Sequence, residues 1–286
     1  MRKISIVTRS VILTAFFAAL FLACNDSPTA PDVIPMYPLI KGMTWKYDIR
    51  IHTENFRPID STFMFTHINQ HYTEQVRVAD TVRLRDSLLT WKFTGTTTDS
   101  ISYTQNFEQY YLASGNELLD VAYRGLGMCY PKRSTPMTYH FRGRSFASPA
   151  AIMAFVEESL PASAETDSLG LYYFTPPLKT LSYPLVTGNR WMYRAFEVVT
   201  AKEVTGFTAV ETPAGSFTTA QVRWLMNYHP DGSYDTAWVV IDAVAPQGLI
   251  NRTIILKDVY VTYDDPTPRG LIDMYDERVL TLRQVQ

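Results

Sequence analysis

Cysteine is scarce in this sequence, which limits how the fold can be stabilised. Only Cys24 and Cys129 occur among its 286 residues. If Cys24 serves another purpose, Cys129 has no partner for an intramolecular disulfide. The fold must then rest on its hydrophobic core even in an oxidising compartment, and we expect Cys129 to be a small core residue rather than a reactive thiol.

Several chemical signatures are missing as well. The sequence has no glycine-rich phosphate loop, no cysteine–histidine zinc set and no stripe of basic and aromatic residues, so we expect no cofactor. The formal net charge is −2, and about −5 without residues 1–23, which hold three basic and no acidic residues. A mildly acidic chain has no electrostatic reason to bind nucleic acid, so we expect no such partner.

The N-terminus has the pattern of an export signal. Three basic residues lie within the first nine, and an apolar stretch of 13 residues runs from Val11 to Ala23. That stretch is too short to cross a hydrocarbon core, which needs about 20 residues. A charged start, a short apolar segment and small residues at the end are typical of a secretory signal, so we predict a signal peptide over 1–23.

The end of the apolar stretch, Phe21-Leu22-Ala23-Cys24, resembles a bacterial lipobox, in which a small residue precedes an invariant cysteine. The match is good at Ala23 and Cys24 and looser at Phe21, where leucine is usual. The resemblance implies that Cys24 is diacylated on sulfur, becomes the new N-terminus and is then acylated on nitrogen. One acyl chain binds a membrane only marginally, whereas three chains would anchor the protein stably. The membrane is therefore an expected partner, reached through the N-terminal lipid anchor.

Residues 24–36 are predicted to be the lipidated cysteine and a flexible tether. Residues 25–36 read NDSPTAPDVIPM, with three prolines and little to bury. Such a segment extends to at most about 40 Å, so the folded part should lie near its membrane. Residue 25 is Asn, whereas the familiar inner-membrane retention signal is Asp at that place. We therefore expect the outer membrane, on its periplasmic or its surface face.

The remainder of the chain alternates between apolar and polar residues. From Trp45 to Ile51 every second residue is apolar, and the same period recurs at 89–93, 137–141 and 220–228. This period is typical of half-buried strands, and polar alternate positions favour antiparallel strands with one wet face. We predict a mainly β fold, with one large curved antiparallel sheet or half-barrel.

One helix is predicted over about 149–160, packed on the sheet. Ser148 can cap its N-terminus and Pro149 suits its first turn. Pro161 would end it. Four apolar residues share one face at helical spacing, namely Ile152, Phe155, Val156 and Leu160.

An internal echo divides the folded part. Residues 37–47 and 183–193 share the pattern Y-P-L-[IV]-x-G-x-x-W-x-Y at an offset of 146. We interpret the copies as two similar openings in one sheet, hence one domain, 37–286, with echoing halves 37–182 and 183–286. Two tandem domains are the alternative, disfavoured because the second half lacks a counterpart to the helix.

The P-L-x-x-G-x-x-W-x-Y opening resembles that of a group of uncharacterised bacterial envelope lipoproteins. Three further stretches are similar to their pattern: Pro-Pro-Leu-Lys at 176–179, the T-P-A-G-x-F turn at 212–217, and the aromatic strand from Trp238 to Gly248-Leu249-Ile250. The resemblance covers most of 37–256. It implies a large curved antiparallel sheet, similar in plan to the lipoprotein-carrier and lipoprotein-receptor proteins of the envelope, and no established activity.

Ser145 is the candidate nucleophile. Residues 143–147, Gly-Arg-Ser-Phe-Ala, follow a strand and precede the helix, as the nucleophile turn of serine hydrolases does. However, Ala147 stands where a second glycine is usual, and the strand–helix alternation of such hydrolases is missing. We therefore expect a connecting loop with a helix cap. A hydrogen bond from Ser145 to His140 or His52 would favour the hydrolase instead.

Two groups of residues have metal-binding chemistry but unsuitable spacing. His67 and His71 are four residues apart, which in a strand is about 13 Å, too far for one ion. The aspartates near the C-terminus lack the spacing of a known calcium loop; they are Asp258, Asp264, Asp265, Asp273 and Asp276. We expect no metal site.

These observations favour a non-catalytic envelope lipoprotein that binds an apolar or amphipathic ligand or an envelope protein partner. A curved sheet rich in tyrosine and tryptophan can leave a concave groove, the usual form of a binding site. One alternative is a structural or assembly component of the outer membrane, which a filled core would favour. The other is a serine hydrolase that uses Ser145. The sequence does not name the ligand-binding residues.

Overall fold

A computed structural model of the chain describes residues 36–285, except 86, 100–102, 126–136, 159–164, 169 and 197. The predicted signal peptide, Cys24, the tether up to residue 35, Cys129, Leu160 and Pro161 lie outside the described residues. The elements are β1 (Met43–Pro58), β2 (Asn69–Leu84), β3 (Leu88–Asp99), β4 (Thr104–Ser114), β5 (Glu117–Arg124), β6 (Met137–Phe141), β7 (Arg144–Phe146), α2 (Pro149–Glu158), β8 (Glu165–Thr166), β9 (Tyr172–Ser182), β10 (Arg190–Arg194), β11 (Thr200–Thr212), β12 (Gly215–Met226), β13 (Trp238–Ala245), β14 (Gly248–Tyr263) and β15 (Asp265–Val285).

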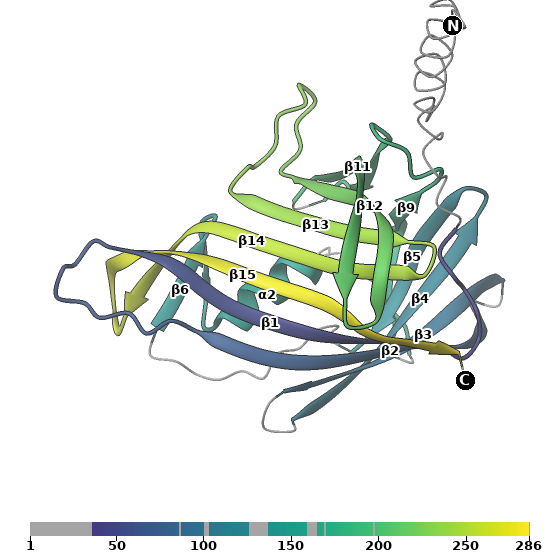
Figure 1. Ribbon diagram of the computed structural model, residues 1–286, viewed down its shortest axis with the longest axis horizontal. Coiled ribbons are helices and arrows are strands. Elements are labelled where there is room, and N and C mark those ends of the chain that lie inside the picture. Colours follow the sequence, from purple (N-terminus) through teal and green to yellow (C-terminus); the bar gives the residue numbers. More distant parts are fainter. Residues whose placement is uncertain are drawn as a thin grey trace, which may run out of the picture. The chain divides into compact units, whose positions relative to one another are not determined.

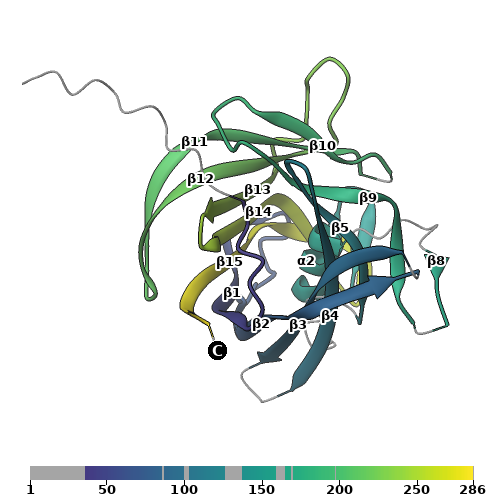
Figure 2. The same ribbon diagram turned by 90° about the vertical axis from the view of Figure 1, so that its right-hand side faces the viewer.

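These strands form one antiparallel sheet that nearly closes on itself (Figures 1 and 2), which confirms the predicted fold class. The order is β10-β11-β12-β13-β14-β15-β1-β2-β3-β4-β5-β9-β8, with β6 paired to β14 and to β7. The first strand therefore lies between the second and the last. Met43 pairs with Val285 at one end of the β1–β15 ladder, and Pro58 pairs with Gly270 at the other.

The burial of β1 follows its alternation. Trp45, Tyr47, Ile49 and Ile51 are buried, whereas the polar residues between them are exposed. The pattern breaks at His52, which is also buried because its ring stacks on Tyr275 with centroids 5.0 Å apart.

In β3 the alternation at 89–93 predicted that the side chain of Leu89 faces inward, and this prediction is wrong. Leu89 is exposed and Thr90 is buried, because Thr90 donates its hydroxyl proton to the Val82 carbonyl at 2.9 Å. A register shift in the partner strand, between Val78 and Asp80, lies along the same ladder. Bulges of this kind change which side chains face inward.

The helix α2 has the predicted start. Ser148 Oγ accepts a hydrogen bond from the Ala151 amide at 3.1 Å, the expected contact of an N-cap residue. Ile152, Met153 and Val156 are fully buried in the largest core cluster, which also contains residues of β1, β14 and β15. In Figure 2 the strands curl round this helix. Among the described residues no helix is both long and apolar enough to span a bilayer.

The two echoing openings have the same turn geometry. Gly42 and Gly188 both have a φ of 84°, in the region that favours glycine. The Gly42 amide donates to the Val78 carbonyl at 2.9 Å, and the Gly188 amide donates to the Val204 carbonyl at 2.8 Å. Each opening therefore ties the start of its strand to a valine in the neighbouring strand.

The sheet has a seam where β9 approaches β10 and β11. No ladder of backbone hydrogen bonds joins β9 to β10 or to β11 in the part of the chain that the structure describes. Two side chains cross the seam instead. Trp191 Nε1 donates to the Lys179 carbonyl at 3.0 Å, and Lys202 Nζ donates to the Thr180 carbonyl at 3.2 Å.

Candidate functional site

A cavity of about 170 Å³ lies inside the sheet. Much of its wall is aromatic, with contributions from Tyr37, Trp45, Phe93, Tyr111, Tyr193 and Trp224. Six charged side chains from six strands also line it: Glu74, Asp120, Lys202, Asp242, Arg252 and Arg278. A buried charge is costly unless it is paired or hydrogen-bonded, so the partners of these groups indicate what the cavity can do.

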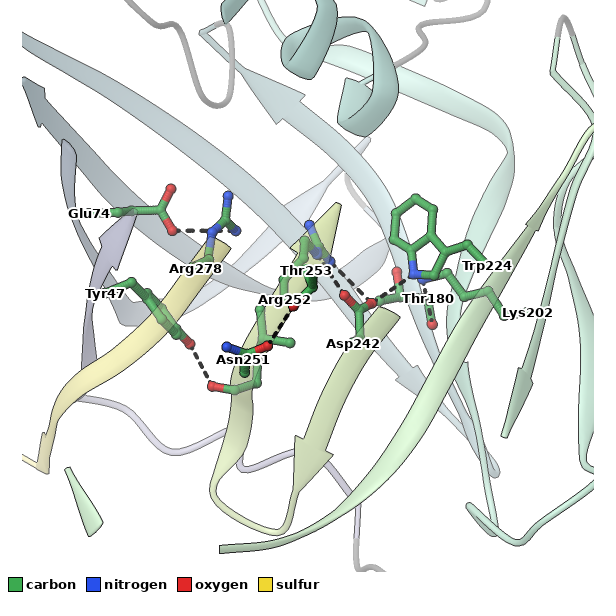
Figure 3. A network of polar contacts seen from close by, with 11 residues as sticks. Tyr47, Glu74, Thr180, Lys202, Trp224, Asp242, Asn251, Arg252, Thr253 and Arg278 are labelled. Atoms are coloured by element: carbon green, nitrogen blue, oxygen red, sulfur yellow. Dashed lines mark hydrogen bonds and ion pairs between the residues drawn. The ribbon is translucent and has the colours of Figure 1, made fainter. Parts of the chain in front are cut away.

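Asp242 and Arg252 form the best-satisfied pair (Figure 3). They face each other across the β13–β14 ladder. Asp242 Oδ1 accepts from Arg252 Nε at 2.6 Å, and Oδ2 accepts from Trp224 Nε1 at 2.8 Å. Burial alone would raise the pKa of Asp242, but the charges of Arg252 and Lys202 and these hydrogen bonds outweigh it and hold the pKa below its usual range. Asp242 is therefore a carboxylate.

Glu74 and Arg278 form a second buried pair, with Oε1 and Nη1 3.6 Å apart. Figure 3 shows this pair beside Tyr47, whose hydroxyl donates to the Leu249 carbonyl at 3.0 Å. Glu74 belongs to β2 and Arg278 to β15, the two neighbours of β1. Each of these two charges is therefore compensated by the other, and both residues line the cavity.

Lys202 is buried in a different way. Lys202 belongs to β11, and 1% of the residue is exposed. Its Nζ lies 4.0 Å from the ring centre of Trp224 and 4.1 Å from that of Tyr193. Among the described residues the Thr180 carbonyl is its one hydrogen-bond acceptor. Burial, assisted by the charges of Arg252 and Arg194, lowers the pKa of Lys202 to about 7, against the opposing effect of Asp242 and Asp120.

Asp120 is the least satisfied charged group of the cavity. It lies in β5, opposite Leu178 of β9 and Tyr111 of β4. Its Oδ1 is buried and has no hydrogen-bond partner among the described residues. Burial raises the pKa of Asp120 well above its usual range, although the charge of Lys202 acts against this.

None of these six residues was predicted from the sequence. The sequence nevertheless contains an indication of each one. Every one of these residues is two positions from an apolar residue of its own strand, and residues two apart share one face of the sheet. Asp242 follows Trp238 and Val240 at intervals of two, and Arg252 lies between Ile250 and Ile254. A charge in the inward phase of a strand indicates a polar interior. The strands were identified by the alternation of apolar and polar residues, and this criterion alone overlooks a charged residue in the apolar phase.

Ser145 and His140 meet in the β6–β7 hairpin. Ser145 Oγ lies 2.9 Å from His140 Nδ1, and His140 Nε2 lies 3.0 Å from Thr262 Oγ1. This is the contact that would favour a hydrolase. Burial lowers the pKa of His140, which favours the neutral ring. The third group is a threonine hydroxyl rather than a carboxylate, and His140 and Ser145 already pair directly across the ladder. Cross-strand pairing explains the contact by itself.

The candidate metal ligands do not gather. His67 lies before β2, in a segment without regular structure rather than in the expected strand. Its Nδ1 is 2.9 Å from the Thr53 carbonyl. Asp258 and Asp273 both pair with Arg57, and Asp265 pairs with Arg269. Within the described residues no three His, Cys, Asp or Glu side chains form a group that could hold a metal ion.

No family model matches this sequence, and no curated protein matches it. Two chains of known structure do. One, from Bacteroides fragilis, is assigned as an exported protein with a YMCC-like fold; it matches with a TM-score of 0.37 and 12% identity over 88% of this chain and 99% of its own. The other, from Parabacteroides distasonis, is assigned as a lipoprotein; it matches with a TM-score of 0.37 and 13% identity over 88% of this chain and 100% of its own. Similarity at this level carries no argument about function.

Proposed function

We propose that the protein is an outer-membrane lipoprotein, anchored through Cys24, that binds a small amphipathic molecule inside its sheet and performs no catalysis. The cavity is the observation that carries the binding proposal. Aromatic walls suit the apolar body of a ligand, and a few convergent polar groups orient it. We also propose that the fold has the same plan as the lipoprotein-carrier and lipoprotein-receptor proteins of the envelope. The support for this is the resemblance of the openings at 37–47 and 183–193.

The volume of the cavity limits the size of the ligand that it can hold. A volume of about 170 Å³ is below the roughly 300–1,000 Å³ of pockets for drug-sized ligands. It is close to the roughly 150 Å³ of an engineered cavity that binds benzene. We therefore expect a ligand with one ring or a short chain and one polar group.

The buried charges argue against a purely structural interior. Replacing a buried ion pair by well-packed apolar side chains is often neutral or stabilising. An interior that served stability alone would gain nothing from Lys202, or from Asp120 with its unsatisfied Oδ1. Strongly perturbed titratable groups that line a cavity are instead typical of functional sites.

Tryptophan fluorescence offers a direct test, because Trp45 and Trp224 line the cavity. Full-length protein extracted in detergent would be titrated with benzyl alcohol, benzoate and benzylamine. We expect at least one to change the emission saturably. Val76→Phe should abolish the change, since Val76 lines the cavity. Val82→Phe is the matched control, because Val82 is an equally half-buried valine of the same strand outside the lining.

The absence of saturable binding by all three probes, with no small molecule retained in native mass spectrometry, would refute the binding proposal and favour the structural alternative. Equal loss of binding in Val76→Phe and Val82→Phe would place the site elsewhere.

A serine hydrolase remains the second candidate, supported by the 2.9 Å contact between Ser145 and His140. Three features count against it. Ser145 lies on an exposed hairpin, the histidine is oriented by Thr262, and the cavity is lined by neither residue. Such a pair resembles the start of a catalytic triad without the carboxylate that usually stabilises the charged imidazole.

A further inference from the structure

Lys202 and Asp120 approach the cavity from either side of the seam. Lys202 Nζ reaches across it to the carbonyl of Thr180 in β9. The other neighbour of β9 is β5, the strand that carries Asp120. The two side chains line the same cavity, and their charges interact. An amine and a carboxyl group thus share one small, largely aromatic chamber.

The surroundings of Lys202 favour its neutral amine. An ammonium group has three protons to donate, yet Nζ has one acceptor among the described residues. The carboxylate of Asp242 is already bound by Arg252 and Trp224. Arg252 and Arg194 add positive charge nearby, while the rings of Trp224 and Tyr193 partly stabilise the cation. The net effect brings the pKa of Lys202 to about 7, so a large fraction is unprotonated at neutral pH. A desolvated lysine beside another cation is a recognised form of activated amine nucleophile.

Asp120 complements that amine. Burial keeps its carboxyl group protonated to a higher pH than usual, so it can donate a proton inside the cavity. Its Oδ1 also lacks a partner within the described residues. A group bound between Asp120 and Lys202 would satisfy both.

We propose that Lys202 captures small aldehydes or ketones as an imine inside the cavity, with Asp120 as the proton donor. The proposal rests on the proposed ligand-binding function and names the chemical class of the ligand, a carbonyl group on a ring or a short apolar chain.

The step balances without an oxidant or a reductant. The Lys202 amine adds to the carbonyl carbon as the C=O π bond breaks, and a proton moves from nitrogen to oxygen to give a carbinolamine. Its hydroxyl group then takes a proton from Asp120 and leaves as water. An iminium ion remains beside the Asp120 carboxylate, and addition of water reverses the reaction.

Reductive trapping tests the proposal. Full-length protein in detergent would be mixed at pH 7 with benzaldehyde and cyanoborohydride, then digested and mapped by mass spectrometry. We expect the benzyl adduct at Lys202 to exceed that at the exposed Lys257 on the order of 10-fold or more, because an ordinary lysine with a pKa near 10.4 is almost entirely protonated at pH 7. Asp120→Asn should slow trapping at Lys202. Lys257→Arg, a matched change at the surface, should leave it unaltered.

Benzyl alcohol separates this proposal from the binding proposal, since it has the same ring and no carbonyl. If benzyl alcohol and benzaldehyde give equal saturable fluorescence changes and Lys202 gains no adduct, the imine is refuted while binding stands. If neither probe binds and no adduct forms, both proposals fall. Because the adduct is mapped in the unmodified sequence, the result does not depend on whether a Lys202 variant folds.

Discussion

Trp45 and Trp191 hold equivalent positions in the two openings and make the same kind of contact. The indole of Trp45 donates to the Gln247 carbonyl at 2.7 Å, and that of Trp191 donates to the Lys179 carbonyl at 3.0 Å. Gly248 makes the first contact possible, because a Cβ there would lie 2.9 Å from Trp45 Nε1. The first tryptophan fastens the β13–β14 turn, and the second crosses the seam.

Both tryptophans are buried, so we expect Trp45→Ala and Trp191→Ala each to lower the free energy of unfolding by about 3–5 kcal/mol. Denaturant titration followed by circular dichroism measures the loss. Trp91→Ala, at a half-buried position, should cost less. If the two variants unfold within about 0.5 kcal/mol of wild type, these contacts do not stabilise the fold.

Lys202 should make stability depend on pH. Its pKa is about 7 in the folded protein and near 10.4 when unfolded. Between these values the unfolded chain binds more protons, so stability rises with pH in this window and the cost of burying the charged lysine is fully present below pH 7. From pH 7 to 9 the gain contributed by Lys202 is about 2 kcal/mol. Asp120 acts in the opposite direction, because its raised pKa lets the folded chain keep a proton that the unfolded chain has already lost.

Urea titrations at pH 7 and pH 9 measure this gain. Lys202→Met should remove most of it, whereas Lys257→Met, at an exposed lysine, should preserve it. An equal change in stability between these pH values in wild type and in Lys202→Met would contradict the assignment of Lys202 as the responsible group.

Ser145 should not react as a hydrolase nucleophile. We expect a fluorophosphonate probe to label wild type and Ser145→Ala equally weakly. The variant should unfold within about 0.5 kcal/mol of wild type, because it loses a single hydrogen bond of an exposed side chain. Labelling that disappears in both Ser145→Ala and His140→Ala would establish a reactive pair and overturn the non-catalytic proposal.

Cys24 should carry the lipid. We expect Cys24→Ala to abolish incorporation of labelled palmitate and either to release the protein from membranes or to leave an uncleaved precursor. Cys129→Ala is the control and should incorporate label normally. Equal labelling of wild type and Cys24→Ala would show that the anchor lies elsewhere. For the native protein, recovery mainly in inner-membrane fractions would contradict the outer-membrane assignment.

The sequence by itself determined the local structure. The alternation from Trp45 to Ile51 predicted a strand with one buried face, and Ser148 and Pro149 predicted the start of α2. The T-P-A-G-x-F stretch at 212–217 marked the tight turn between β11 and β12. These features depend on residues a few positions apart, where side-chain period, capping and turn chemistry act directly.

Only the tertiary structure decided which strands meet and what they enclose. Placing β1 against β15 pairs residues more than two hundred positions apart, and register shifts such as that between Lys46 and Tyr47 set which side chains face inward. The same long-range arrangement brings Asp120 and Lys202 into one cavity and Thr262 against His140. Periodicity cannot encode such meetings, because it fixes the face of each strand and leaves the order of the strands to the packing of the whole sheet.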